Sequence, residues 1–165
     1  MSRKHPKRIP RPGVDEYGRT PLHYASSEGN LERVRELIAH GSSPTAQDDD
    51  GWSPLHFAIQ GGHAAIIDYL LESGADPNAT DSQGNGPLWV ATLNARGDYR
   101  FVTRLLKAGA DARRKNKHGR SPYDMAMTIR HGLDEVFANV QDVPQRRALQ
   151  RTGTRPGVRR SVPVV

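Results

Sequence analysis

Histidine, aspartate and glycine are the residues of this chain whose spacing could support metal binding or catalysis. The sequence has seven histidines and no cysteine, so it offers no thiolate nucleophile and no cysteine-bearing zinc site. No two histidines have the i, i+4 spacing that the His-Glu-x-x-His zinc motif uses on one helix. We therefore expect no metal site built on histidine.

Two shorter patterns resemble ligand loops without completing them. The three aspartates at 48–50, followed by Gly51, resemble the start of a calcium loop, but the downstream ligands and the bidentate glutamate are missing. We expect a solvated turn there. Gly61-Gly62 is not followed by the Gly-Lys-Ser or Gly-Lys-Thr of a phosphate-binding loop. The sequence therefore predicts a protein without enzymatic activity, metal or cofactor.

The charges are segregated between the ends and the middle of the chain. The whole sequence carries 24 Lys and Arg against 18 Asp and Glu, a net charge of +6. Residues 1–13 hold five basic and no acidic residues, and residues 141–165 hold six arginines and one aspartate, so each end carries +5. The middle, residues 14–140, carries −4. Both ends contain proline but no aromatic residue, which predicts that they are basic, disordered tails.

The middle of the chain is itself divided by charge. Residues 14–80 carry −8 and residues 81–140 carry +4. We therefore expect a protein partner, with a bipolar charge as the sharper hypothesis. The basic tails could neutralise phosphates of a nucleic acid, but no base-reading or stacking element accompanies them. Binding of nucleic acid through the tails is the weaker alternative.

The sequence shows no sign of membrane insertion or export. No apolar run approaches the roughly 20 residues that a membrane-spanning helix needs. The basic N-terminus is not followed by an apolar stretch, so we expect no secretory signal. These patterns favour a cytoplasmic protein, or a nuclear one if the source is eukaryotic.

Three series of glycines share one period along the chain. The first series is spaced by 33, 33 and 35 residues, and its members are Gly18, Gly51, Gly84 and Gly119. The strings that follow begin Arg-Thr-Pro-Leu-His in the first copy and Trp-Ser-Pro-Leu-His in the second. The change from 33 to 35 predicts a two-residue insertion around Ala95-Arg96 in the third copy. Such a period indicates a repeat protein.

Each repeat is predicted to form two antiparallel helices and a turn. Thr20 and Ser53 are suitable N-caps, and the proline that follows each is preorganised for the first helical position. In the second repeat we expect helices from Leu55 to Gln60 and from Ala64 to Glu72, the latter with an apolar stripe. One unit is too small to bury its own apolar face, so neighbouring units must stack into a solenoid.

The period and two strings resemble the ankyrin repeat family. The strings are Thr-Pro-Leu-His and Leu-Leu-x-x-Gly-Ala-Asp, the second beginning at Leu70 and again at Leu105. The resemblance implies an all-α solenoid of about four helix-turn-helix repeats with turn or β-hairpin-like fingers, at about 15–47, 48–80, 81–115 and 116–140. It also implies a structural role for His23 and His56, which Trp89 and Asp124 replace in the last two repeats.

The family resemblance implies that partners bind at the turn tips and in a concave groove on the first helices. Trp52 is the first candidate, because we expect it to be exposed on a turn where it has no role in folding, and tryptophan is frequent in interface hot spots. The candidate partner-binding residues are Tyr17, Arg19, Tyr24, Asp50, Trp52, Phe57, Gln60, Asn85, Leu93, His118 and Arg120.

These patterns together predict a monomeric protein–protein interaction module. A narrower resemblance to small, free-standing bacterial ankyrin repeat proteins suggests an alternative, an immunity or inhibitor protein that neutralises a toxin or an enzyme. A nucleic-acid-associated protein that binds through residues 1–13 and 141–165 is the other alternative.

Overall fold

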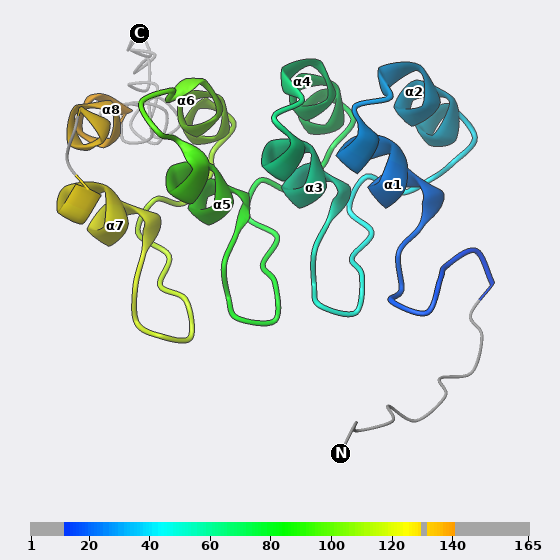
Figure 1. The fold of residues 1–165 in the computed structure, drawn as a ribbon, viewed down its shortest axis with the longest axis horizontal. Helices are drawn as coiled ribbons and strands as arrows, with labels where there is room; N and C mark the ends of the chain where they lie inside the picture. The colour runs from blue at the N-terminus through cyan, green and yellow to red at the C-terminus, as the bar shows by residue number, and fades with distance from the viewer. Residues whose placement is uncertain (1–11, 130–131, 141–165) are drawn as a thin grey trace, which may run out of the picture.

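The computed structural model describes residues 12–129 and 132–140, which form four stacked pairs of helices (Figure 1). No strand forms within these residues, so the predicted all-α repeat solenoid is confirmed. Apart from Pro12 and Gly13, the predicted tails lie outside the described residues. The helices are α1 (Pro21–Glu28), α2 (Leu31–Ala39), α3 (Pro54–Gly61), α4 (Ala64–Glu72), α5 (Pro87–Asn94), α6 (Arg100–Lys107), α7 (Pro122–Ile129) and α8 (Leu133–Val140).

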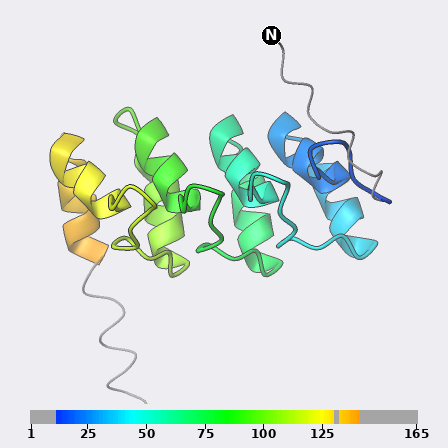
Figure 2. The ribbon, with the colours of Figure 1, turned by 90° about the horizontal axis from the view of Figure 1, so that it is seen from below.

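The helices lie in two rows, and a loop projects beside each pair (Figures 1 and 2). We call α1, α3, α5 and α7 the inner helices and α2, α4, α6 and α8 the outer helices. The loops lie on the side of the inner helices, and we call them fingers 1 to 4, at residues 13–19, 46–52, 79–85 and 114–120. The fingers and the inner helices therefore lie on the same side of the structure (Figure 1).

Each inner helix begins at a proline that follows an N-cap residue or its equivalent in the repeat. Thr20 caps α1 and Ser53 caps α3, and a histidine three residues on accepts a hydrogen bond from each N-cap backbone N–H. Helix α3 runs one residue further at each end than expected, whereas α4 has the predicted bounds. In the last repeat Asp124 replaces the histidine and accepts from the N–H of Ser121 at 2.9 Å. The Asp124 carboxylate therefore caps α7 as the imidazoles of His23 and His56 cap α1 and α3.

The core runs through all four repeats, between the two rows of helices. Leu22, Leu55 and Leu88 occupy one position of successive inner helices, and each is at most 2% exposed. Facing them, the outer helices bury Val34, Ile67 and Val102. Because each buried layer lies between neighbouring repeats, burial of apolar surface holds the stack together.

The predicted insertion lies in the turn between α5 and α6. There Arg96 has a φ of +35°, the one positive value at a non-glycine residue in the described part of the chain. Asp98 and Arg100 form an ion pair of 2.6 Å in the same turn. The two extra residues are therefore accommodated without disturbing the helix pair.

Candidate partner-binding surface

Each finger is organised by one carboxylate or amide at the same repeat position. In finger 2, Asp48 Oδ1 accepts hydrogen bonds from the backbone N–H of Asp50 at 3.0 Å and of Trp52 at 2.8 Å. The equivalent bonds, 2.8–3.1 Å long, are made in the other fingers by Asp15, Asp81 and Asn116. No sequence-based prediction named this pattern, although an Asp or Asn stands three residues before each glycine of the first series.

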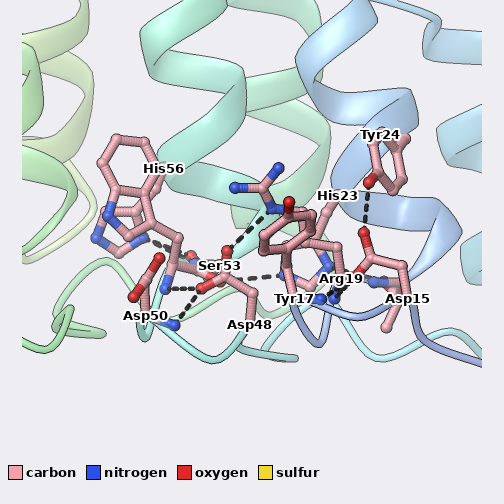
Figure 3. Close-up of polar contacts among 11 residues, drawn as sticks. Asp15, Tyr17, Arg19, His23, Tyr24, Asp48, Asp50, Ser53 and His56 are labelled. Carbon is pink, nitrogen blue, oxygen red and sulfur yellow. Dashed lines mark hydrogen bonds and ion pairs between the residues drawn. The ribbon is translucent and has the colours of Figure 1, made fainter. Parts of the chain in front are cut away.

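Asp48 differs from the solvated turn residue that the sequence predicted. It is 7% exposed, and its second carboxylate oxygen faces Arg19 of finger 1 (Figure 3). The expectation of a solvated turn is therefore wrong for Asp48, because the preceding finger covers it. Asp50 is exposed, as expected for a tip residue.

Backbone hydrogen bonds join the finger tips into a single row. In each of fingers 2, 3 and 4, one backbone N–H donates to a carbonyl of the finger before it. These bonds are Asp49 N to Tyr17 O at 2.9 Å, Ser82 N to Asp50 O at 2.7 Å and Lys117 N to Gln83 O at 2.9 Å. The tips therefore have a fixed register, and their side chains form an ordered surface rather than four independent loops.

Arg19 is held by one carboxylate and two aromatic rings. Its Nε lies 3.3 Å from Asp48 Oδ2, and its guanidinium carbon lies 5.2 Å from the ring centre of Tyr17 and 5.1 Å from that of Phe57. The side chain is still 31% exposed. Cation–π contacts and an ion pair thus restrict a flexible side chain while leaving part of it accessible. We call Arg19, Tyr17, Asp48 and Phe57 the Arg19 cluster.

Trp52 packs against its own repeat instead of standing free. It is partly buried against the core, with ring centroids 5.5 Å from His56 and 5.3 Å from Phe57. The expectation of an exposed tryptophan without a role in folding is therefore wrong. Its proposed contact with a partner stays a prediction.

Two tyrosines of the first repeat remain accessible. Tyr17 is 53% exposed in finger 1 and Tyr24 is 42% exposed on α1. The hydroxyl of Tyr24 donates to Asp15 Oδ2 at 2.5 Å, and this hydrogen bond raises the pKa of the phenol. Figure 3 shows Tyr24 and Asp15 beside Arg19.

The two repeated histidines are buried and hold the framework of the surface. His23 Nδ1 accepts from the N–H of Thr20, which leaves the proton on Nε2, 3.1 Å from the carbonyl oxygen of Trp52. His56 Nδ1 accepts in the same way from Ser53. Burial lowers the pKa of both, that of His56 to about 4. Neutral, enclosed imidazoles of this kind are structural.

The remaining candidate residues are distributed over all but the first repeat. Asn85 is half-buried and accepts from Asn116 Nδ2 at 2.8 Å, which links fingers 3 and 4. The exposed ones are Gln60, Leu93, His118 and Arg120. Among the described residues, no hydrogen bond or ring contact connects them with the Arg19 cluster. The structure therefore brings the aromatic candidates together and leaves the others along the stack.

Neither a metal centre nor a membrane span occurs in the described ranges. No group of three or more His, Asp or Glu residues there could hold a metal ion. The helices in the same ranges are too short or too polar to cross a bilayer.

Comparison with known proteins identifies the architecture. The profile of the family described as ankyrin repeats in three copies matches residues 7–81. These residues include the first two described helix pairs, and α5 to α8 continue the same arrangement. No curated protein matches the chain. The matched residues 7–81 therefore belong to the ankyrin repeat family, and the later helix pairs and fingers repeat the same architecture.

Proposed function

We propose that this protein binds a protein partner through its inner helices and fingers and catalyses no reaction. Ankyrin repeats are generally protein–protein interaction modules. The proposal adds where this chain would bind, and the distribution of its exposed apolar side chains supports that location.

The exposed large hydrophobic side chains of the described structure all belong to the fingers and the inner helices, and they are spread along the stack. They are Tyr17, Tyr24, Leu93 and Ile129, which belong to finger 1 or to the inner helices α1, α5 and α7. The described side chains of the outer helices include none. Because exposed apolar groups add nothing to the core, their restriction to one side favours a binding role.

The Arg19 cluster adds a preorganised contact at the first two repeats. Arg19 is already fixed by Asp48, Tyr17 and Phe57, so a partner would lose little additional side-chain entropy on binding it. Arginine and tyrosine are also enriched among residues that dominate interface energies. The inhibitor and nucleic-acid alternatives stay predictions, and no contact of the described residues favours either.

Binding can be tested once a partner is identified by affinity purification and mass spectrometry. Isothermal titration calorimetry would then compare the wild type with Tyr17→Ala and Leu93→Ala. We expect each variant to weaken binding about tenfold or more, the effect of losing about 1.4 kcal/mol. Tyr24→Phe keeps the ring, so it should bind more tightly than Tyr24→Ala.

The matched control is a change on the opposite side, Glu32→Ala on α2, which should leave the affinity unchanged. Circular dichroism would verify that every variant keeps its helix content. Wild-type affinity in both Tyr17→Ala and Leu93→Ala, with a loss in Glu32→Ala, would place the interface on the outer helices and overturn the proposal.

A further inference from the structure

The tips of the four fingers change charge in one direction along the stack. The two residues after each organising Asp or Asn occupy the same place at the tip of every finger. The pairs are Glu16 and Tyr17, Asp49 and Asp50, Ser82 and Gln83, and Lys117 and His118. The row is therefore acidic at fingers 1 and 2, uncharged at finger 3 and basic at finger 4.

The charges at both ends of this row are accessible. Glu16 and Asp50 are exposed at the acidic end, and Lys117 and Arg120 are exposed at the basic end. None of these four forms an ion pair with another described residue, whereas Arg19, the finger 1 equivalent of Arg120, is paired with Asp48. Their charges are therefore left for a partner instead of being neutralised within the fold.

The row is also held in register, which makes the charge order a property of the surface. Each step between fingers carries a backbone hydrogen bond of 2.7–2.9 Å. Side-chain contacts add to all three steps: Arg19 with Asp48, Gln47 Nε2 with the carbonyl oxygen of Thr80 at 3.0 Å, and Asn116 with Asn85. A partner that crosses the fingers must meet the acidic and basic ends in this order.

We propose that the finger row binds a protein segment with a basic end and an acidic end. The basic end of the segment lies over fingers 1 and 2, and its acidic end lies over finger 4. This inference rests on the proposed function and specifies the chemistry of its partner. A uniform polyanion such as a nucleic acid fits poorly, because Glu16 and Asp50 would repel it.

Synthetic peptides of fixed composition test the charge order directly. The probe is a fluorescein-labelled peptide with a block of lysines, a Gly-Ser spacer and a block of glutamates. Its control has the same residues with the charges alternating. At low ionic strength, fluorescence anisotropy should show the block peptide binding about fivefold or more tightly. Equal affinity of the two peptides would overturn the proposal.

Matched charge reversals locate the binding on the row. Asp50→Lys and Lys117→Glu should each weaken binding of the block peptide by about fivefold. Glu72→Lys at the end of α4 and Lys107→Glu at the end of α6 make the same charge changes at exposed residues outside the row. These two controls should bind as the wild type does. Equal losses in the controls would show only a net-charge effect and overturn the proposal.

Paramagnetic relaxation tests the orientation of the segment. A nitroxide on the lysine end of the peptide should broaden backbone NMR signals of finger 2, and a nitroxide on the glutamate end should broaden those of finger 4. Because the protein has no cysteine, it cannot exchange with a thiol-linked label. The same broadening pattern from both labels would overturn the orientation.

Two further measurements show whether a negative result concerns the charge order alone or the proposed function as well. Sedimentation at low and high salt would reveal a dimer; if Asp50→Lys abolished it, a second copy would occupy the row and overturn the proposal. If the peptide experiments fail while Tyr17→Ala and Leu93→Ala still weaken binding of the purified partner, the interaction module stands and only the charge order is wrong.

Discussion

The Nε2 atom of His23 donates a hydrogen bond to the carbonyl oxygen of Trp52, which lies 3.1 Å away in the finger of the next repeat. The other ring nitrogen accepts from the N–H of Thr20 at 2.9 Å. One neutral imidazole therefore caps the start of α1 and links finger 2 to α1 by a hydrogen bond. The candidate surface depends on this link, because it holds finger 2 against the inner helix of the preceding repeat.

Replacing His23 with alanine should destabilise the protein. The change removes the acceptor of the Thr20 N–H and the donor to the Trp52 carbonyl, and each lost partner costs about 1–3 kcal/mol. We expect a total of about 2–4 kcal/mol in urea unfolding. The control His40→Ala, at an exposed residue, should change the free energy of unfolding by less than about 0.5 kcal/mol. Similar costs for both would contradict the proposed link.

Acidification should destabilise the fold between pH 6.5 and about 4. His56 is fully buried, and burial lowers its pKa from 6.5 to about 4, so the unfolded chain takes up a proton before the folded one does. Its contribution is complete above pH 6.5 and is lost as the pH falls toward 4, by about 3 kcal/mol in all. Burial lowers the pKa of His23 too, so its effect has the same sign.

Urea unfolding at pH 7.5 and pH 4.5 would measure this loss, with His56→Gln as the comparison. The variant should start from a lower stability and lose less of it on acidification. Hydrogen bonds from Arg100 lower the pKa of Asp98, so that carboxylate loses its contribution only below its ordinary value of 3.8, in a separate pH range. An unchanged pH dependence in His56→Gln would contradict the assignment.

A pair of asparagines, like the one that joins fingers 3 and 4, should be able to replace the contact between Arg19 and Asp48. Asn85 and Asn116 occupy the equivalent positions there, 2.8 Å apart. Asp48→Asn alone would set an amide against the Arg19 guanidinium and should cost about 1–2 kcal/mol. The double change Asp48→Asn with Arg19→Asn should recover part of that loss, as a double-mutant cycle would show. Strictly additive costs would argue against direct coupling.

Asp48→Ala should cost more than Asp48→Asn. Alanine offers no acceptor for the N–H groups of Asp50 and Trp52, whereas asparagine does, as Asn116 demonstrates in finger 4. We expect about 2–4 kcal/mol for the alanine variant in urea unfolding. Equal stability of the two variants would show that the acceptor contributes nothing to the finger.

Alanine should be tolerated better in the last finger than in the second. Gly51 and Gly119 both have positive φ, +83° and +72°, so alanine strains each backbone by about 1 kcal/mol. At Gly51 a Cβ would also lie 2.9 Å from the Cα of Asp81 in the next finger, while at Gly119 it meets nothing within 4 Å. Thermal unfolding should therefore show a larger loss, by about 1–3 kcal/mol, for Gly51→Ala. Equal losses would contradict the close finger packing.

The repeat number, the period and, to within one residue, the two helices of the second repeat could be predicted from the sequence alone. Those signals are local: Thr20 and Ser53 precede a proline at a helix start, and apolar residues of α4 recur at helical spacing. Each can be recognised within one repeat, and the 33-residue period then places the others. The candidate residues of the fingers and inner helices could be named in the same way, from their place in the repeat.

Which of those candidates are accessible depends on how the repeats stack. Asp48 is buried because Arg19, 29 residues earlier, covers it, and Trp52 is half-buried because it packs on His56 and Phe57. The sequence shows which residues share a repeat position, but not what the neighbouring repeat places beside them. Exposure is therefore settled only when the repeats stack, since each finger is enclosed by residues about one period away.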